Sequence, residues 1–245
     1  MRIGVYGLGR FGSFWAESLY KAGCEVVAWS RNQHELPQGV KAASEEEVLS
    51  QDYVFFAVTI SAFEDVLRRV GGKVGKNSVI LDTCSVKTYP AKWMRKYLPE
   101  ENYKIATHPM FGPDSGRNGL SGLPIVMCPI SKIDERYQKV KELFHSMGLE
   151  VLEMSEREHD EEAAYSQGIT HFVGRTLREM GMAPTPIATQ GYRNLMAIVD
   201  QTCNDPLQLF YDLQRYNPYA KEMRLSLQVA IEKTLNRLAK EEDRL

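Results

Sequence analysis

The sequence of 245 residues lacks the features that mark several classes of protein. It has four cysteines, Cys24, Cys84, Cys128 and Cys203, which are widely spaced and form no CxxC pair. That pattern argues against a disulfide framework or a metal site and fits a reducing cytoplasm. No uninterrupted apolar run approaches the ~20 residues that a bilayer span needs. The charges are interspersed and sum to −2, so we expect no nucleic-acid partner and no membrane contact. The chain opens on a strand pattern, and we therefore expect no signal peptide.

The first twelve residues carry the strongest motif. A short apolar run, Ile3–Tyr6, predicts a buried strand that leads into Gly7-x-Gly9-x-x-Gly12, and an amphipathic helix over 11–22 follows. In this context the motif indicates a dinucleotide site, with the pyrophosphate at the helix N-terminus. A glycine-rich turn without a ligand is the alternative. The turn residues expected at the cofactor are Gly7, Leu8, Gly9, Arg10, Phe11 and Gly12.

The end of the second predicted strand indicates which dinucleotide to expect. It is followed by Ser30 and Arg31, where an NAD-selective site usually has Asp or Glu for the ribose 2′-hydroxyl. A guanidinium can bind a 2′-phosphate through two hydrogen bonds, and a hydroxyl can donate to it. We therefore expect NADP, unless Arg31 is an ordinary solvated loop cation. Val58 and Thr59, at the end of the next strand, are expected to face the same cofactor.

Up to about residue 150, short β-rich runs alternate with helical stretches. This alternation predicts an α/β fold of Rossmann type, with a doubly wound, mostly parallel sheet. From about Ser155 onward the β-branched runs disappear and helical periodicity takes over. We therefore predict a dinucleotide-binding domain over 1–154 and an all-helical substrate and dimerisation domain over 155–245. The predicted strands are Ile3–Tyr6, Val26–Trp29, Tyr53–Val58, Val79–Asp82, Lys104–Thr107, Pro124–Cys128 and Leu149–Glu153.

The helical part has recognisable starts and ends. Glu156–Gly181 predicts one long helix that ends at a glycine before a proline-containing loop, and Tyr192–Cys203 predicts a second. Asp205-Pro206 and Asn217-Pro218 each place a capping residue before a proline, which marks two further helix starts. The last helix, about 218–241, has one apolar side. That side either packs within the chain or forms a dimer interface.

Two loops at predicted strand ends carry candidate chemistry, because ligands of such sheets bind beyond the carboxyl ends of the strands. The first, Asp82–Lys87, contains Ser85, whose alternative role is to cap a helix. The second, Thr107–Gly116, has His108 at the tip of its strand. A histidine there can accept a proton near neutral pH, and a loop histidine bonded to backbone is the alternative.

Together, these motifs and others in the second half of the chain resemble those of the prephenate/arogenate dehydrogenases of tyrosine biosynthesis. The resemblance is greatest to the plant-type branch of that family. The matching motifs are Gly7-x-Gly9-x-x-Gly12, Ser85-Val86-Lys87, His108-Pro109-Met110-Phe111-Gly112, the stretch QGITHFVGR over 167–175, Thr185-Pro186-Ile187 and Gly191-Tyr192. The resemblance covers nearly the whole chain. It implies an N-terminal Rossmann domain, a C-terminal helical dimerisation domain with an active site between the two, and a homodimer.

The resemblance also implies a reaction and roles for residues. A cyclohexadienol gives hydride to the nicotinamide, loses its hydroxyl proton and releases its ring carboxylate as carbon dioxide while the ring becomes aromatic. Neutral His108 is expected to accept the hydroxyl proton, and Ser85 to hydrogen-bond the same hydroxyl. Gln167 and His171 stand at i and i+4 on one helix face, so both are expected at the substrate, unless His171 is only a polar residue at an interdomain seam. Lys87 is a supporting charge at the site or a solvated helix cation.

One motif departs from the family pattern. Many bacterial members carry two arginines in a GFRDxxR stretch, of which the second binds a substrate carboxylate. Here Arg193 keeps the first place and Ala197 occupies the second. The carboxylate anchor is therefore open between Arg193, Arg175 and an arginine of a partner subunit.

Substrate choice is expected to depend on charge in the loop after His108. Arogenate carries an ammonium where prephenate carries a ketone, so a nearby carboxylate favours arogenate. By resemblance, the position that sets this preference is Asn118, a neutral amide, whereas Asp114 is expected to face the loop backbone. We therefore expect NADP-dependent conversion of prephenate to 4-hydroxyphenylpyruvate, with conversion of arogenate to tyrosine as the alternative.

Two more distant alternatives stay open. Another NADP-dependent oxidoreductase, such as a β-hydroxyacid dehydrogenase or an imine reductase, is expected to place lysine or aspartate where this chain has Gln167 and His171. A non-catalytic NADP-binding sensor would bind the cofactor without turnover.

Overall fold

The structure, a computed structural model, describes residues 1–242 of the chain. It consists of two compact units, the first formed by Met1–His159 and the second beginning at Asp160. Within the described residues, no helix combines the length and the apolar character needed to cross a membrane.

The first unit is built on an eight-stranded sheet with the strand order β3-β2-β1-β4-β5-β6-β7-β8. Neighbouring strands are parallel except β6 and β7, which run antiparallel. This confirms the predicted α/β fold with a mostly parallel sheet. The strands are β1 (Arg2–Tyr6), β2 (Glu25–Trp29), β3 (Lys41–Ala42), β4 (Tyr53–Phe56), β5 (Val79–Asp82), β6 (Tyr103–Pro109), β7 (Pro124–Pro129) and β8 (Glu150–Glu153).

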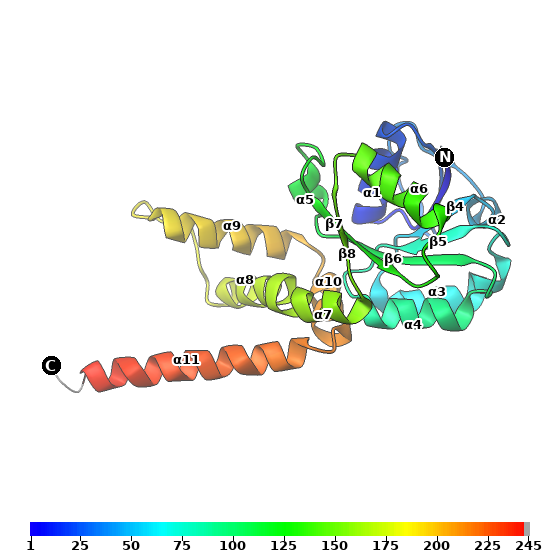
Figure 1. Ribbon diagram of the computed structural model, residues 1–245. Coiled ribbons are helices and arrows are strands. Elements are labelled where there is room, and N and C mark those ends of the chain that lie inside the picture. The colour runs from blue at the N-terminus through cyan, green and yellow to red at the C-terminus, as the bar shows by residue number, and fades with distance from the viewer. Residues whose placement is uncertain (243–245) are drawn as a thin grey trace. The chain divides into compact units, whose positions relative to one another are not determined.

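Helices cover both faces of this sheet. Figure 1 shows α1 (Arg10–Lys21) and α6 (Glu135–Ser146) on one face and α3 (Ile60–Val70) and α4 (Thr88–Tyr97) on the other. Two short helices, α2 (Glu45–Leu49) and α5 (Pro113–Gly116), and a 3₁₀ turn, Gly71–Lys73, lie in the connections.

Aromatic rings fill the core beneath α1 and α6. Trp15 of α1 meets Phe55 of β4 edge to face with ring centroids 5.8 Å apart, and Phe144 of α6 packs against both. All three residues are fully buried. Such pairs contribute roughly 0.5–1.5 kcal/mol each beyond the burial of their area, so the strands that carry the site rest on a rigid layer.

Two details of the first unit differ from the prediction. The sequence analysis missed β3, because its two exposed residues, Lys41 and Ala42, form no apolar run. His108 was predicted at the tip of a strand ending at Thr107, but β6 continues through Pro109 because His108 pairs with Val126 of antiparallel β7. His108 is therefore a buried strand residue, not a loop residue.

The carboxyl ends of the central strands meet at one edge of the sheet. Tyr6 is in register with Trp29 and Phe56, and Phe56 is in register with Asp82. Backbone hydrogen bonds continue this alignment past the strand ends, from Gly7 N to Trp29 O (2.8 Å) and from Ala57 N to Tyr6 O (2.9 Å). The glycine motif and the loops after β2, β4 and β5 therefore leave the sheet side by side.

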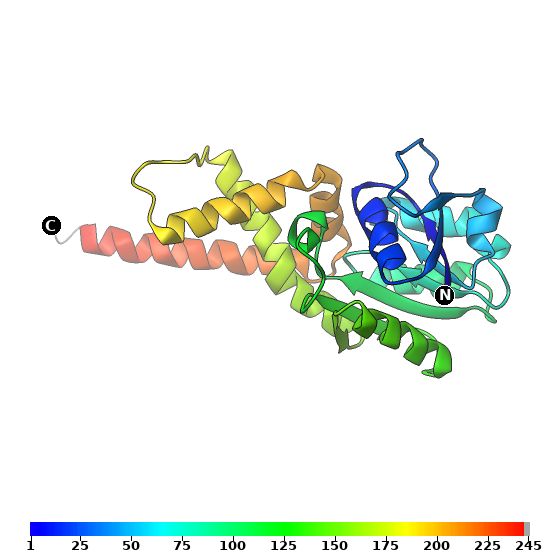
Figure 2. The same ribbon diagram turned by 90° about the horizontal axis from the view of Figure 1, so that it is seen from above.

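The second unit is helical. Its helices are α8 (Ile169–Glu179), α9 (Gln190–Asn204), α10 (Leu207–Tyr216) and α11 (Ala220–Glu242). The helix predicted over 156–181 is present as α7 (Glu156–Ala163), a π-helical turn (Ala164–Gly168) and α8 in direct succession. Helices α8 and α9, which a loop joins in Figure 2, pack closely at Gly174, where a Cβ would lie 2.2 Å from Thr202 Oγ1.

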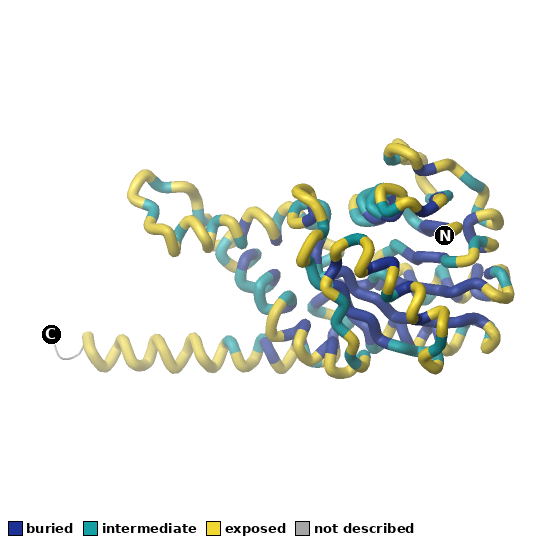
Figure 3. The backbone as a smooth tube through the Cα atoms, turned by 45° about the horizontal axis from the view of Figure 1, so that its top comes forward, coloured by how far each residue is buried: buried dark blue, intermediate teal, exposed yellow. Residues whose placement is uncertain are grey.

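The long helix α11 is anchored only at its start. Asn217 caps it by accepting a hydrogen bond from Tyr219 N (2.9 Å) and donates to the carbonyl of Asp160 (2.7 Å). Met223 is fully buried, but beyond Arg224 the helix is almost wholly exposed, as its colour in Figure 3 shows. The exposed apolar side chains there are Leu225, Val229, Ile231, Leu235 and Leu238. Most of the predicted apolar side of this helix therefore does not pack within the chain.

Candidate active site

The glycine motif forms a turn that only small residues can make. Gly7 has φ +108°, and a Cβ there would lie 2.4 Å from the carbonyl oxygen of Ala57. A Cβ on Gly12 would lie 2.1 Å from the carbonyl oxygen of Gly7, whereas a Cβ on Gly9 would meet no atom within 4 Å. Gly9 is also the N-cap of α1, with no side-chain capping bond. The open side of Gly9 and the amides at the helix start thus form a cradle that fits a pyrophosphate.

Other predicted cofactor residues line the same sheet edge. Ser30 and Arg31 follow directly after β2, Ser30 half-buried and Arg31 exposed. Val58 is half-buried after β4, and exposed Thr59 is the N-cap of α3. These positions agree with a nucleotide that lies across the ends of β1, β2 and β4, because parallel strands end together there.

Arg10 connects the glycine motif to the loop that follows His108. Its guanidinium forms an ion pair with Asp114 of α5 at 2.5 Å. Asp114 was expected to face its own loop backbone, and its carboxylate reaches this cation on α1. Asn118, which follows α5, is exposed.

His108 is buried at the end of β6. It is 2% exposed, and its Nδ1 atom lies 2.8 Å from Nε2 of His159, which is equally buried. Burial lowers the pKa of His108 well below its ordinary value, and the neighbouring His159 and Lys87 act in the same direction. His108 is therefore neutral at pH 7, as a general base must be.

A buried ion pair holds the strand ends around His108. Lys87 is 0% exposed and donates to Asp82 Oδ2 and to the carbonyl of Thr107, both at 2.5 Å. Asp82 in turn accepts from Thr107 N (3.1 Å) and Cys84 N (2.9 Å). Of the two readings for Lys87, this burial favours a supporting charge over a solvated helix cation. Half-buried Ser85 lies between these anchors, and the N-cap of α4 is Lys87, so Ser85 does not cap that helix.

In the second unit, the predicted Gln167 and His171 lie on one stretch of helix. Gln167 belongs to the π-helical turn, and His171 lies in the first turn of α8. The buried atoms Gln167 Oε1 and His171 Nδ1 have no hydrogen-bond partner within the described residues. Because unpaired buried polar atoms are costly and π-helical turns often occur at functional sites, this stretch is suited to a polar ligand.

The two candidate arginines differ in their surroundings. Arg175 donates to the carbonyls of Thr202 (3.1 Å) and Asp205 (2.8 Å), and its guanidinium lies 5.3 Å from the ring centroid of Phe210. Arg193 is exposed on α9. Arg175 thus helps to hold α8 against the segment after α9, while Arg193 presents its charge to solvent.

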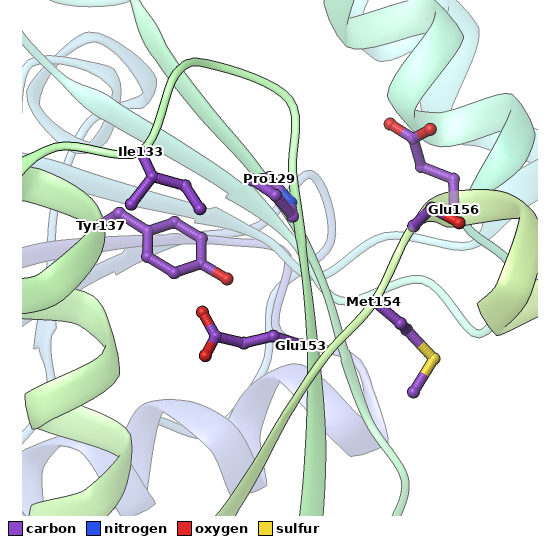
Figure 4. Close-up of a pocket in the computed structure, with 7 residues that line it drawn as sticks. Pro129, Ile133, Tyr137, Glu153, Met154 and Glu156 are labelled. Atoms are coloured by element: carbon purple, nitrogen blue, oxygen red, sulfur yellow. The ribbon is translucent and has the colours of Figure 1, made fainter.

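A separate pocket in the first unit contains none of the predicted residues. It has a volume of about 330 Å³ and lies beside β8 and α6. Figure 4 shows Tyr137 with its hydroxyl directed toward Glu153; burial raises the pKa of Tyr137. The lining residues are Pro129, Ile133, Tyr137, Glu153, Met154, Ser155 and Glu156.

His159 and Asp82 were not predicted as site residues. His159 is one of only five histidines in the sequence and lies in the first turn of the helix after β8, which is the signal that could have drawn attention to it. Asp82 was predicted as the last residue of a strand and the first residue of the loop Asp82–Lys87, but its contacts with Lys87 and with Thr107 of β6 were not predicted.

The chain matches two family models and several known proteins. The family model for the prephenate dehydrogenase nucleotide-binding domain matches residues 28–153, and one described as the TYRAAT1-like C-terminal domain matches 176–245. Arogenate dehydrogenase 2 of Arabidopsis thaliana is 35% identical over 244 residues, which are 95% of this chain and 68% of that protein. Arogenate dehydrogenase 1 of the same plant is 34% identical over 244 residues, again 95% of this chain but 38% of that longer protein.

Solved structures share the fold. Synechocystis arogenate dehydrogenase superposes with a TM-score of 0.71 at 18% identity, covering 99% of this chain and 93% of that one. Prephenate dehydrogenase from A. aeolicus, solved with hydroxyphenyl propionate and NAD+, gives a TM-score of 0.71 at 19% identity, with 98% and 90% covered.

The sheet and its glycine cradle define a Rossmann-type dehydrogenase whose nucleotide-binding domain implies a nicotinamide cofactor. The chain belongs to the prephenate/arogenate dehydrogenase family, in its plant-type branch.

We predict that His171 makes stability depend on pH. Burial, followed by the charge of Arg175, lowers the pKa of His171 from 6.5 to about 4. The unfolded chain therefore binds a proton between pH 6.5 and about 4 that the folded chain does not, so stability is complete above this window and falls within it. The expected loss is about 3 kcal/mol. Urea unfolding across this pH range measures it.

His171→Asn should make the loss of stability between pH 6.5 and about 4 smaller by the contribution of His171 and leave that of His108, whose pKa is also lowered. His145→Asn, a change at an exposed histidine on α6, should leave the dependence as it is. Asp205 Oδ2 lies 4.0 Å from His171 Nε2, and its attraction for the imidazolium opposes the shift. Equal slopes in wild type and His171→Asn would contradict the prediction.

Proposed function

We propose that this protein catalyses the NADP-dependent oxidative decarboxylation of prephenate to 4-hydroxyphenylpyruvate in tyrosine biosynthesis. The observation that carries the proposal is His108, a neutral, buried histidine at the end of β6, beside the strand ends that form the nucleotide cradle. Family membership supports the reaction class.

The residues fit the demands of the chemistry. The nicotinamide, when bound, accepts the hydride from the hydroxyl-bearing ring carbon. His108 takes the hydroxyl proton as that carbon becomes a carbonyl, and Ser85 directs the hydroxyl toward it. The ring carboxylate then leaves as carbon dioxide, its bonding electrons aromatise the ring, and His108 returns the proton to the phenolic oxygen. From the second unit, we propose Gln167 and His171 as substrate-binding residues.

Turnover tests the proposal directly. NADPH formation, followed by absorbance, should occur with prephenate or arogenate, and a sensor without catalysis would show none. His108→Ala should lower kcat by about 10²–10⁴-fold with little change in the dissociation constant of NADP. Because the pKa of His108 is lowered, the wild-type rate should decline only below the usual histidine range. Near-normal kcat in His108→Ala would remove His108 from the mechanism.

Cofactor choice follows from Ser30 and Arg31. A 2′-phosphate can accept from both side chains, and no carboxylate stands at that place to repel it. NADP should therefore give a higher kcat/KM than NAD, and the combined change Ser30→Asp and Arg31→Ala should reverse the order. Arg117→Ala, which removes an exposed arginine of the loop after His108, serves as the charge-matched control. Equal use of both cofactors by the wild type would refute the assignment.

We propose Asn118 as the residue that favours prephenate over arogenate. The Arabidopsis relatives are named arogenate dehydrogenases, so this preference is the sharper test of the proposal. The nearest acidic residue in the sequence of that loop, Asp114, is paired with Arg10, which weakens its attraction for an ammonium.

Asn118→Asp should raise kcat/KM for arogenate and lower it for prephenate, because a carboxylate attracts the ammonium and repels the ketone oxygen. The control Asn118→Gln keeps the amide and should retain the wild-type order. The selector role fails if wild type already prefers arogenate, or if the ratio of the two kcat/KM values stays the same in Asn118→Asp.

We propose a homodimer formed through the C-terminal helices. Ile231, Leu235 and Leu238 follow one another at helical spacing on the exposed part of α11. A helix without packing partners gains little stability from helix propensity alone. We therefore expect a second copy of the chain to pack against the exposed apolar side chains of α11. Ile231→Glu with Leu235→Glu should shift the sedimentation of the protein to the monomer, and Asn236→Glu on the same helix should not. A monomeric wild type would contradict this proposal.

We further propose a reducing compartment such as the cytoplasm. Cys24, Cys84 and Cys128 are buried and Cys203 is partly exposed, and none of these four described residues is in a disulfide. The two Arabidopsis relatives are named as chloroplastic.

A further inference from the structure

The contact between His108 and His159 restricts where protons can sit. The Nδ1 and Nε2 atoms of the two rings are 2.8 Å apart, and the rings meet edge to face with centroids 5.0 Å apart and planes at 69°. Both side chains are 2% exposed, so bulk water does not compete for this bond. Between two neutral imidazoles, one nitrogen must donate and the other must accept.

Only one of the two arrangements leaves His108 able to act as a base. If His108 Nδ1–H donates to His159 Nε2, the Nε2 atom of His108 carries a lone pair. If His159 Nε2–H donates instead, His108 carries its proton on Nε2 and has no lone pair left to accept another. The tautomer of His159 therefore decides whether His108 can take a proton from substrate.

The position of His159 is fixed by its helix start. Ser155 and Glu158 form a capping box: Ser155 Oγ accepts from Glu158 N (3.2 Å), and Glu158 Oε2 accepts from Ser155 N (2.8 Å). Glu156 forms an ion pair with Arg95 of α4. The first turn of α7 is thus attached to the helix that follows Ser85 and Lys87.

The surroundings make a neutral acceptor at His159 valuable. When His108 gains a proton it becomes a cation in a buried site, where the charge of Lys87, which is bonded to Asp82, already disfavours a second cation. A hydrogen bond from the new imidazolium to a neutral imidazole nitrogen stabilises that cation in a medium of low polarity.

We propose that His159 is a positioning residue for His108: its Nε2 atom accepts the His108 Nδ1–H, which holds the lone pair of His108 on Nε2 and supports the imidazolium formed during turnover. The part of this proposal that concerns turnover rests on the proposed dehydrogenase function. The choice of tautomer rests on that function too, because only this tautomer leaves His108 able to act as a base, but its test needs no substrate.

The tautomer is tested first, on the wild-type protein. The chain contains five histidines, so ring-nitrogen NMR of protein labelled in histidine can be assigned with single variants. At neutral pH, His108 should carry its proton on Nδ1 and show a lone-pair shift at Nε2. A spectrum with the His108 proton on Nε2 would overturn the proposal without any variant, and whether or not either substrate turns over.

Kinetics of two variants test the effect on catalysis. His159→Leu keeps apolar bulk but removes the acceptor, and kcat should fall by about 10–10³-fold. The KM for substrate, the dissociation constant of NADP and the melting temperature should change little. His159→Gln offers an amide oxygen to the His108 Nδ1–H and should recover most of kcat. His145→Leu, at an exposed histidine on α6, is the matched control.

The outcomes separate the two proposals. Absence of turnover in wild type, together with the Nδ1–H tautomer of His108, refutes the function and leaves only the tautomer assignment in place. Normal kcat and an unchanged His108 spectrum in His159→Leu refute the positioning role and leave the function in place. Parallel losses in kcat, NADP affinity and melting temperature, without recovery in His159→Gln, would assign His159 a merely structural role and refute the proposal.

Discussion

The candidate site depends on one buried ion pair, Lys87 with Asp82. Both side chains are fully buried, and they bind the backbone of β6 as well as each other. Two buried charges are costly, and a pair of this kind is often no more stabilising than apolar residues of equal volume. Its value here is geometric, because it fixes the end of β5 to the end of β6. Removing either partner alone would leave a buried charge, at a cost of about 3–5 kcal/mol.

This constraint also sets the electrostatics of His108. A cation held permanently beside a buried imidazole disfavours a second cation, so Lys87 and burial both keep His108 neutral. His171 in the second unit is neutral for the same two reasons, burial and a nearby arginine. Burial beside a fixed cation thus keeps both histidines neutral at pH 7 and leaves the positive charge to Lys87 and Arg175.

The sequence was sufficient for the parts of the fold that periodicity and glycine determine. Seven of the strands and the glycine turn could be predicted, because apolar runs and a required positive φ at Gly7 are local properties. The end of β6 could not, because His108 is held in the strand by pairing with β7, which lies far along the chain. The π-helical turn at Ala164–Gly168 has no marker in helical periodicity either, since the residues on both sides continue the same pattern.

The candidate site shows the same limit more sharply. Ser85 and His108 could be found because each directly follows or ends a predicted strand. His159 could not be placed, because its contact with His108 joins residues 51 positions apart through the first turn of α7. The position of His108 at a strand end is thus recognisable in the sequence, whereas its contact with His159 is defined only in three dimensions. For that reason, motif resemblance identifies the family more readily than it identifies the contacts between the residues of the candidate site.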